Sequence, residues 1–172
     1  DVDRTRARPD VEQALRDDLA WLGVHWDAET PRQTSRDYGP ALARLAPRLY
    51  RCQCTRAMRD LPTPPGAGCP GACRERGFTE GAVRFRLLPG TMTFVDRRWG
   101  QQSADPQAFG DPILVRRDGL VSYNLAVVTD DIADGVTDVV RGSDLLEYTS
   151  VQIQLWEALG AAPPRWMHTP LV

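Results

Sequence analysis

The sequence predicts an α/β protein that is interrupted by a cysteine-rich insertion with antiparallel β structure. Three observations predict this fold class: a helical pattern of apolar residues opens the chain, all four cysteines fall within residues 52–73, and two continuous apolar runs lie in the last third. Such runs are typical of strands buried on both faces, as in a parallel sheet covered by helices. We therefore divide the chain into a first core part (residues 1–50), an insertion (51–118) and a second core part (119–172).

The first part is expected to hold two helices. Over residues 9–22, Pro9 suits the first turn, apolar residues recur on one face, and Gly23 is a stop signal. Residues 24–26 then predict a short buried strand. A second helix is expected over residues 38–50, where Pro47 should kink or shorten it.

The middle part changes composition. Residues 52–81 are rich in Cys, Pro, Gly and Arg, which disfavours both helix and strand. Residues 83–87 then alternate apolar and basic side chains, which is typical of a half-exposed strand. We expect residues 91–95 to be its partner strand and residues 113–115 to form another strand.

The last third predicts two strands and a helix. The strands are the apolar runs at residues 125–128 and 136–140. A helix follows over residues 150–159, with Thr149 as the N-cap, Gln152 at the capping-box position and Gly160 as the stop.

The composition excludes several classes of enzyme. All 21 basic residues are arginines, so no lysine is present for a P-loop or a Schiff base. The net charge of −2 gives no general basic field for nucleic acid, and no apolar run has the length of a membrane span, about 18 residues. We expect a cytoplasmic protein that does not associate with a membrane.

The four cysteines form two close pairs, Cys52 with Cys54 and Cys69 with Cys73, joined by a Pro- and Gly-rich loop. Four thiolates in this arrangement suit a tetrahedral Zn²⁺ ion, and the closed ligand set indicates a structural metal. Zinc would also stabilise a segment that has no apolar core of its own. Cross-paired disulfides and free buried thiols are the alternatives, and a cytosolic chain disfavours disulfides.

Polar residues lie at the ends of the two predicted strands of the last third. Tyr123 precedes the first strand and Arg141 follows the second. Ligands of open α/β sheets bind at strand ends, and a guanidinium there can grip a carboxylate through two hydrogen bonds. Alternatively, Arg141 pairs with Asp144 or Asp130 and Tyr123 only packs.

Several segments, in order along the chain, resemble the class I glutamyl-type tRNA synthetases. They are DVDRTR at residues 1–6, LAWLGVHWD at 19–27, QTSR at 33–36, residues 123–131 and 140–145, and HTPLV at 168–172. The resemblance covers nearly the whole chain. It implies a Rossmann-type parallel sheet interrupted by a zinc-binding, antiparallel β insertion.

Within this family the chain is most similar to the glutamyl-queuosine tRNA(Asp) synthetases. The resemblance implies activation of glutamate by ATP with Mg²⁺, without tRNA, and transfer to queuosine in the anticodon of tRNA(Asp). It assigns Tyr123 and Arg141 as glutamate contacts and residues 52–74 as the zinc element. The family usually has Tyr where this sequence has Cys69, and a thiolate is an equally sound zinc ligand.

Two family signatures fall outside residues 1–172. The His-x-Gly-His type signature should precede Asp1, and the Lys-Ser-Lys type loop should follow Val172. Both stabilise phosphate charge during activation. We therefore expect that these 172 residues alone do not catalyse adenylation.

Two other functions stay open from the sequence. One is the catalytic core of a glutamyl-tRNA synthetase that charges tRNA(Glu), and the other is a non-catalytic, zinc-stabilised RNA-binding module. We expect a monomer whose insertion faces RNA. Arginines of the insertion are candidate phosphate contacts: Arg84, Arg86, Arg97, Arg98, Arg116 and Arg117.

Overall fold

The computed structural model describes residues 2, 8–54, 69 and 71–171. It separates into two compact units, Asp1–Asp37 and Tyr38–Val172. Each unit is described by itself below.

The smaller unit contains helix α1 (Pro9–Trp21) and the 3-10 turn η1 (Gln33–Ser35). Ion pairs join α1 to the segment that follows it, from Arg16 to Glu29 at 2.5 Å and from Arg32 to Glu12 at 2.6 Å. The predicted helix is confirmed. The predicted strand at residues 24–26 is wrong: these residues form no strand, because no described segment of this unit pairs with them, and they are exposed.

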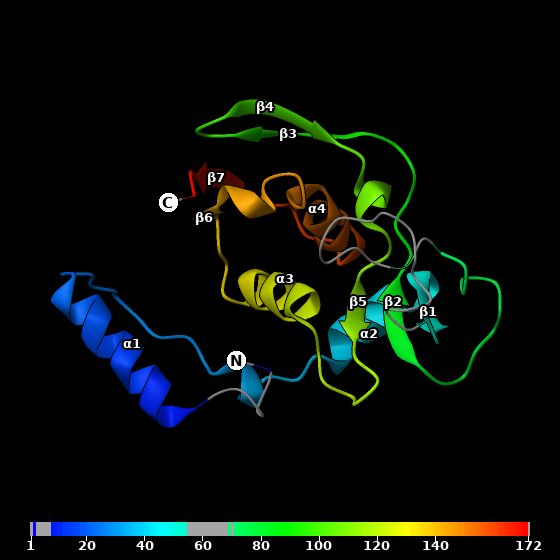
Figure 1. Cartoon of the computed structure of the whole chain (residues 1–172), viewed down its shortest axis with the longest axis horizontal. Coiled ribbons are helices and arrows are strands. Elements are labelled where there is room, and N and C mark those ends of the chain that lie inside the picture. Colours follow the sequence, from blue (N-terminus) through cyan, green and yellow to red (C-terminus); the bar gives the residue numbers. More distant parts are fainter. Residues whose placement is uncertain (1, 3–7, 55–68, 70, 172) are drawn as a thin grey trace. The chain divides into compact units, whose positions relative to one another are not determined.

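The larger unit holds thirteen elements within its described residues (Figure 1). In chain order they are α2 (Gly39–Leu45), η2 (Ala46–Arg48), β1 (Leu49–Cys52), β2 (Ala82–Phe85), β3 (Met92–Asp96), β4 (Gly100–Ala104), η4 (Pro106–Phe109), β5 (Ile113–Val115), α3 (Tyr123–Ala133), β6 (Asp138–Gly142), η5 (Ser143–Leu145), α4 (Thr149–Ala158) and β7 (Arg165–Thr169). Among the described residues, no helix has the length and apolar character needed to cross a membrane.

Two sheets organise this unit. One is antiparallel, in the order β1-β2-β5, and the other is mixed, in the order β4-β3-β7-β6. In the mixed sheet β7 is parallel to both β3 and β6, whereas β3 and β4 form a hairpin. The strand expected at residues 91–95 therefore exists as β3, but its partners are β4 and β7 rather than β2.

The mixed sheet joins strands from both sides of residue 118, where we expect the insertion to end. Asp96 of β3 aligns with Trp166 of β7. The fold is α/β, with parallel pairing around β7 and antiparallel pairing in the middle of the chain. The three-part division of the chain stays a prediction.

The second predicted helix is shortened at Pro47, as expected, whereas one predicted strand is wrong. Helix α2 ends at Leu45, a 3-10 turn containing Pro47 follows, and Leu49 already begins β1 instead of continuing the helix to residue 50. Residues 125–128 lie inside helix α3 instead of a strand, because a short apolar run does not distinguish a buried strand from a buried helix. The run at residues 136–140 does contain a strand, β6, although Val140 is exposed.

Helix α4 is the centre of the core. Every residue from Thr149 to Trp156 is buried, and α4 packs against α3 and β3 (Figure 1). The predicted capping box is wrong, since the N-cap residue is Tyr148 and its side chain makes no capping hydrogen bond. Gln154 instead joins α4 to the chain beyond β2, accepting from the backbone N–H of Leu88 at 2.9 Å and donating to its carbonyl at 3.0 Å.

A buried aspartate joins the antiparallel sheet to the residues around Cys73. The carboxylate of Asp111 accepts hydrogen bonds from the Tyr50 hydroxyl at 2.7 Å, from Arg74 at 2.6 Å and from the backbone of Leu87 at 2.9 Å. Arg84 of β2 is also buried and donates to the carbonyl of Asp111 at 2.6 Å. The expectation of a half-exposed strand with a basic face is therefore wrong at Arg84.

We predict that Asp111→Asn destabilises the protein by about 3 kcal/mol, because the amide keeps only one of the two accepting oxygens and leaves the Arg74 cation without its ionic partner. The matched control is Asp118→Asn, which affects an exposed pair with Arg116 and should cost less than about 1 kcal/mol. Urea unfolding of both variants measures the difference. Equal destabilisation by the two substitutions would contradict the central role of Asp111.

Candidate functional site

The structure brings the four predicted cysteines together beside β1. All four sulfur atoms lie within 4.8 Å of one another, and the Cys54 sulfur is 3.9 Å from that of Cys69 and 3.4 Å from that of Cys73. These distances exceed a disulfide bond, which is about 2.05 Å long. They fit four ligands around one ion, since metal–sulfur distances of about 2.3 Å in a tetrahedron separate the sulfurs by about 3.8 Å.

Local geometry holds the cysteine segment in place. At Gly81 the backbone φ is +118°, and a Cβ there would lie 2.5 Å from the carbonyl oxygen of Cys52, so only glycine fits. Arg117, after β5, donates to the carbonyls of Gln53 at 2.5 Å and Cys54 at 3.2 Å. The turn after β5 therefore supports the first cysteine pair.

The thiols perturb one another strongly. Burial and the neighbouring thiols raise the pKa of Cys54 to about 12. Burial opposes ionisation of Cys73 too, but hydrogen bonds from the Gln53 backbone and from Cys54 and Cys52 outweigh it and lower the pKa of Cys73. The cluster thus resists carrying several negative charges unless a cation offsets them.

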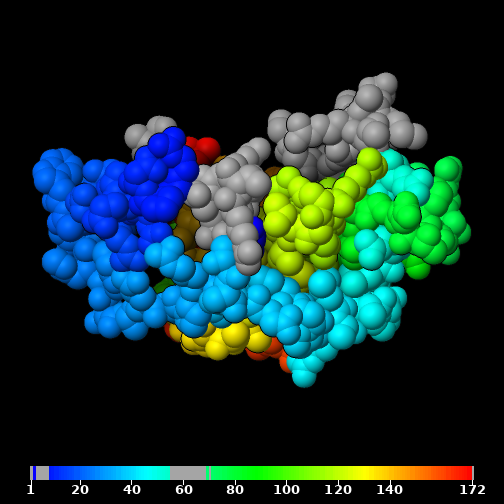
Figure 2. Space-filling model, turned by 90° about the horizontal axis from the view of Figure 1, so that it is seen from below, coloured from blue at the N-terminus to red at the C-terminus, as the bar shows by residue number. Residues whose placement is uncertain are grey.

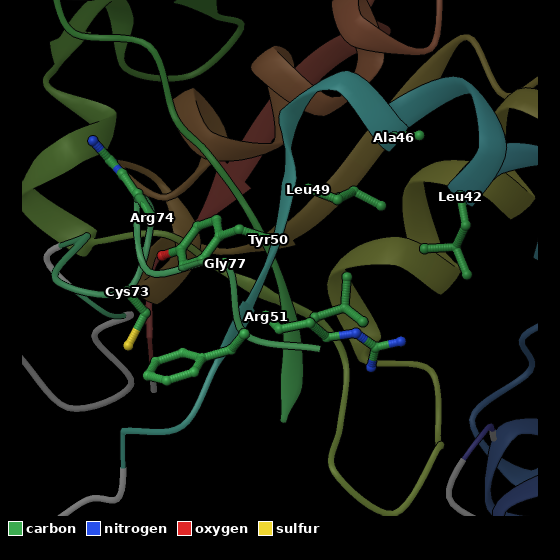
Figure 3. A pocket seen from close by; sticks show the side chains of 10 residues that line it. Leu42, Ala46, Leu49, Tyr50, Arg51, Cys73, Arg74 and Gly77 are labelled. Carbon is green, nitrogen blue, oxygen red and sulfur yellow. The ribbon is translucent and has the colours of Figure 1, made fainter. Parts of the chain in front are cut away.

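A hollow of about 540 Å³ adjoins the cluster (Figure 3). Its walls come from α2, β1 and the residues after Cys73, including Leu42, Tyr50, Arg74 and Phe78. The same surface can be followed in Figure 2, where residues of α2 and β1, in cyan, lie beside green residues of the segment that includes β2. The Tyr50 hydroxyl and Arg74 are already bound to Asp111, so the polar groups at this wall serve the structure.

Arg141, on β6, is the centre of a second cluster. Its Nε donates to Nε2 of His168 at 3.0 Å and its Nη1 to the Gln152 side-chain oxygen at 2.5 Å. Its Nη2 donates to the Thr149 hydroxyl at 2.8 Å and to the Leu145 carbonyl at 3.3 Å. All four acceptors are electrically neutral.

No carboxylate of the described residues lies within ion-pair distance of Arg141. Burial lowers the pKa of Arg141, against the opposing effects of Tyr123, Asp131 and Asp144. Charges taken out of water normally have an ionic partner, so a half-buried guanidinium without one favours an anionic ligand. The alternative that Arg141 is neutralised by Asp144 or Asp130 has no ion pair to support it here.

Tyr123 begins α3, is 53% exposed, and is near enough to Arg141 to raise the pKa of the guanidinium. Its role as a glutamate contact stays a prediction. Four of the five N–H groups of Arg141 are used by the four protein acceptors. The remaining N–H group is on Nη1, so a ligand carboxylate could bind this group together with the Tyr123 hydroxyl. Two hydrogen bonds from Arg141 to the carboxylate would require the ligand to displace one of the four protein acceptors.

Glycine at position 142 shapes the turn after β6. A Cβ on Gly142 would lie 2.5 Å from a carboxylate oxygen of Asp144. A side chain at position 142 would displace the end of the Asp144 side chain. Asp144 is near enough to Arg141 to influence its pKa but forms no ion pair with it.

Four residues of this cluster, His168, Asp96, Thr149 and Gln152, are not predicted as site residues by the sequence. His168, on β7, is fully buried and its Nδ1 lies 2.7 Å from a carboxylate oxygen of Asp96, which ends β3. Helix α4 supplies Thr149 and Gln152, which were assigned to capping. The available signal was that His168 is one of only two histidines in the chain.

Most of the candidate RNA-contacting arginines already have protein partners. Arg84 is buried, so its assignment as a phosphate contact is wrong. Arg86 pairs with Glu75, Arg97 with Asp138 and Arg116 with Asp118. Arg98 lies over the ring of Trp99, and contact with RNA by the exposed arginines stays a prediction.

The comparisons with known proteins identify the family of the chain. The family model of the tRNA synthetases class I (E and Q), catalytic domain, matches residues 74–172. The chain therefore belongs to the glutamyl- and glutaminyl-type class I tRNA synthetase family.

The chain is similar to curated proteins named glutamyl-Q tRNA(Asp) synthetase. It is 46% identical over 187 positions to the protein of Bordetella bronchiseptica and 41% identical over 201 positions to that of Nitratidesulfovibrio vulgaris. In both comparisons all of this chain is matched, against 59% and 62% of the relatives. The chain thus spans about three fifths of the length of these relatives.

Solved structures support the fold. A glutamate tRNA ligase from Elizabethkingia meningosepticum, in complex with its amino acid, matches all of this chain and 41% of its own, with a TM-score of 0.81 and 22% identity. The glutamate-tRNA synthetase of Elizabethkingia anophelis gives a TM-score of 0.82, also at 22% identity.

We predict that Asp131→Asn stabilises the protein above pH 6. Burial, together with Asp130 and Asp134, raises the pKa of Asp131 to about 6. In the unfolded chain the value is about 3.9, so ionisation of Asp131 removes stability as the pH rises from about 4 to 6. After allowance for solvent screening, the gain should be about 1 kcal/mol at pH 7 and should vanish below pH 4.

Thermal unfolding between pH 4 and 8 measures this difference, with Asp18→Asn, an exposed aspartate of α1, as the control. The prediction is wrong if the difference in thermal stability between Asp131→Asn and the parent protein does not change with pH, because the pKa of Asp131 would then not be raised by folding.

Proposed function

We propose that this protein activates glutamate with ATP and transfers it to queuosine in the anticodon of tRNA(Asp). The observation that carries the proposal is the half-buried Arg141 guanidinium, which is bound by four neutral acceptors and has no carboxylate partner within ion-pair distance among the described residues. Such a cation suits the carboxylate of an amino-acid substrate.

The charged groups around Arg141 suit a ligand that carries both a negative and a positive charge. Arg141 and the hydroxyl of Tyr123 offer hydrogen bonds to a carboxylate. Asp131 and Asp144 are close enough to influence the pKa of Arg141, so negative charge is available for an ammonium group. Tyr123 and Arg141 are accordingly our proposed glutamate contacts.

The choice of acceptor follows from the relatives. The proteins of Bordetella bronchiseptica and Nitratidesulfovibrio vulgaris, which match this chain over its full length, are named for tRNA(Asp). ATP with Mg²⁺ would supply the activating phosphoryl chemistry, as in the family. A Rossmann-type core interrupted by a zinc-bearing insertion is the architecture that goes with this proposal.

The second candidate is a glutamyl-tRNA synthetase that charges tRNA(Glu). The specific observation in its favour is the TM-score of 0.81 to the glutamate tRNA ligase of Elizabethkingia meningosepticum. The identity of 22% is far below the 46% shared with the glutamyl-Q relative, which is why we place tRNA(Asp) first.

We also propose that the cysteine cluster holds one structural Zn²⁺ ion. Cys52, Cys54, Cys69 and Cys73 provide four sulfur ligands at the spacing that a tetrahedral site requires. Bound zinc supplies positive charge that keeps the thiols ionised together. A closed set of four protein ligands leaves no position for a substrate, so the ion stabilises the fold.

The prediction is one zinc per chain in protein prepared without added metal. Metal analysis by inductively coupled plasma mass spectrometry measures it. Cys73→Ser should lower the zinc content to about one tenth or less and reduce the thermal stability, because a serine hydroxyl is a poor zinc ligand at neutral pH. A parent protein with far less than one zinc per chain, and with no loss of stability in Cys73→Ser, would refute the zinc site.

The proposed reaction predicts transfer of labelled glutamate to tRNA(Asp) that carries queuosine. The protein expressed from its complete reading frame is incubated with ATP, Mg²⁺ and glutamate, and the label bound to RNA is counted. Removal of Arg141 in the variant Arg141→Ala should raise the KM for glutamate about 100-fold, because a charged hydrogen-bonding group is lost.

Unmodified tRNA(Asp) and tRNA(Glu) are the controls for the acceptor. Labelling of tRNA(Glu) instead of queuosine-bearing tRNA(Asp) would establish the second candidate. No glutamate-dependent ATP–pyrophosphate exchange at all would refute both functions and favour a non-catalytic RNA-binding module.

A further inference from the structure

We propose that Asp96 and His168 are positioning residues for Arg141, which hold its guanidinium in the orientation that meets the substrate carboxylate. Neither residue is proposed to touch the substrate. The inference rests on the proposed function, because it assumes that Arg141 binds glutamate.

The three side chains form one continuous chain of hydrogen bonds. A carboxylate oxygen of Asp96 lies 2.7 Å from Nδ1 of His168, and Nε2 of the same imidazole accepts from Nε of Arg141 at 3.0 Å. His168 is 0% exposed and Asp96 is 1% exposed. The residues come from β3, β7 and β6, which are neighbouring strands of the mixed sheet.

The protonation state of the imidazole follows from its neighbours. Nε of an arginine always carries a hydrogen, so Nε2 of His168 must present its lone pair to Arg141. The Thr149 hydroxyl, 3.3 Å from the same nitrogen, instead donates its proton to the Leu145 carbonyl. The proton of a neutral His168 therefore sits on Nδ1 and is donated to Asp96.

Asp96 is well suited to fix this tautomer. Burial raises its pKa, but hydrogen bonds from His168 and from the backbone N–H groups of Trp99 and Arg98 outweigh burial and lower it. Its second oxygen accepts from those two N–H groups at 2.9 Å each. An ionised carboxylate on Nδ1 makes Nε2 a stronger acceptor, as it does for the histidine ligands of metal sites.

The arrangement restricts Arg141 without neutralising it. The imidazole fixes the Nε edge, Thr149 fixes Nη2, and the ring of Trp166 lies 4.8 Å from the central carbon of the guanidinium. If Asp96 bound Arg141 directly, its carboxylate would neutralise the positive charge of the guanidinium. The neutral imidazole between them fixes the orientation of the guanidinium and leaves its charge available to an anionic ligand.

Two substitutions of His168 separate positioning from packing. In His168→Gln the side-chain carbonyl can reach the place of Nε2 and accept from Arg141, whereas in His168→Asn the shorter amide can reach only the place of Nδ1 and bind Asp96. Both variants are neutral and polar, and both remove the imidazole ring. Only His168→Gln retains an acceptor for Arg141.

The measurement is the KM for glutamate, the KM for ATP and kcat in ATP–pyrophosphate exchange, with the protein from its complete reading frame. We expect His168→Asn to raise the KM for glutamate about tenfold or more and His168→Gln to raise it less than about threefold. In both variants kcat and the KM for ATP should stay within about twofold. Equal glutamate KM values in the two variants would overturn the proposal.

A spectroscopic readout on the parent protein keeps the proposal testable if a variant does not fold. ¹⁵N-histidine labelling of the protein from its complete reading frame gives a set of imidazole signals, and nuclear Overhauser contacts with the stacked ring of Trp166 identify that of His168. We expect the neutral tautomer with the proton on Nδ1 at neutral pH. An imidazolium, or a proton on Nε2, would overturn the proposal.

Failure of this inference is distinguishable from failure of the proposed function. If Arg141→Ala raises the glutamate KM but the two His168 variants behave alike, Arg141 binds glutamate and the positioning role is wrong. If Arg141→Ala leaves the glutamate KM unchanged, the proposed site is wrong, and the positioning role that depends on it is wrong as well.

Discussion

The larger unit holds a half-buried positive charge, that of Arg141, which no carboxylate of the described residues neutralises through an ion pair. Arg141 requires several acceptors, and a single element could not supply them. Helix α4 contributes Thr149 and Gln152, β7 contributes His168, and the turn after β6 contributes the Leu145 carbonyl. The cation therefore joins helix α4 to β6, β7 and the turn after β6.

Helix α4 is unusual among buried helices because its buried part carries polar side chains. A helix that is buried all round is usually apolar, yet α4 carries Thr149, Gln152 and Gln154 in its buried part. Gln154 is satisfied by the backbone at Leu88, whereas Gln152 accepts from Arg141 and its amide nitrogen makes no hydrogen bond among the described residues. The polar side of α4 therefore serves both the fold and the Arg141 pocket.

The sequence predicts local clusters well and distant contacts poorly. The four cysteines lie within 22 positions of one another, so their spacing alone predicts that they meet. Asp96 and His168 are 72 positions apart, and no local pattern indicates that β3 pairs with β7. Thr149 and Gln152 match a capping box in sequence, but the guanidinium of Arg141 offers them a stronger partner than the helix terminus does. Residues 125–128 were predicted as a strand because their apolar run lacks a period that distinguishes the two structures.

One carboxylate links the hairpin of the predicted insertion to the pocket of the predicted core. Asp96 holds the turn between β3 and β4 through the N–H groups of Arg98 and Trp99, and with its other oxygen it holds His168. The indole N–H of Trp99 also donates to the His168 carbonyl at 2.9 Å. Because the same two residues fix the hairpin turn and the imidazole that orients Arg141, the conformation of this hairpin and the geometry of the pocket are not independent.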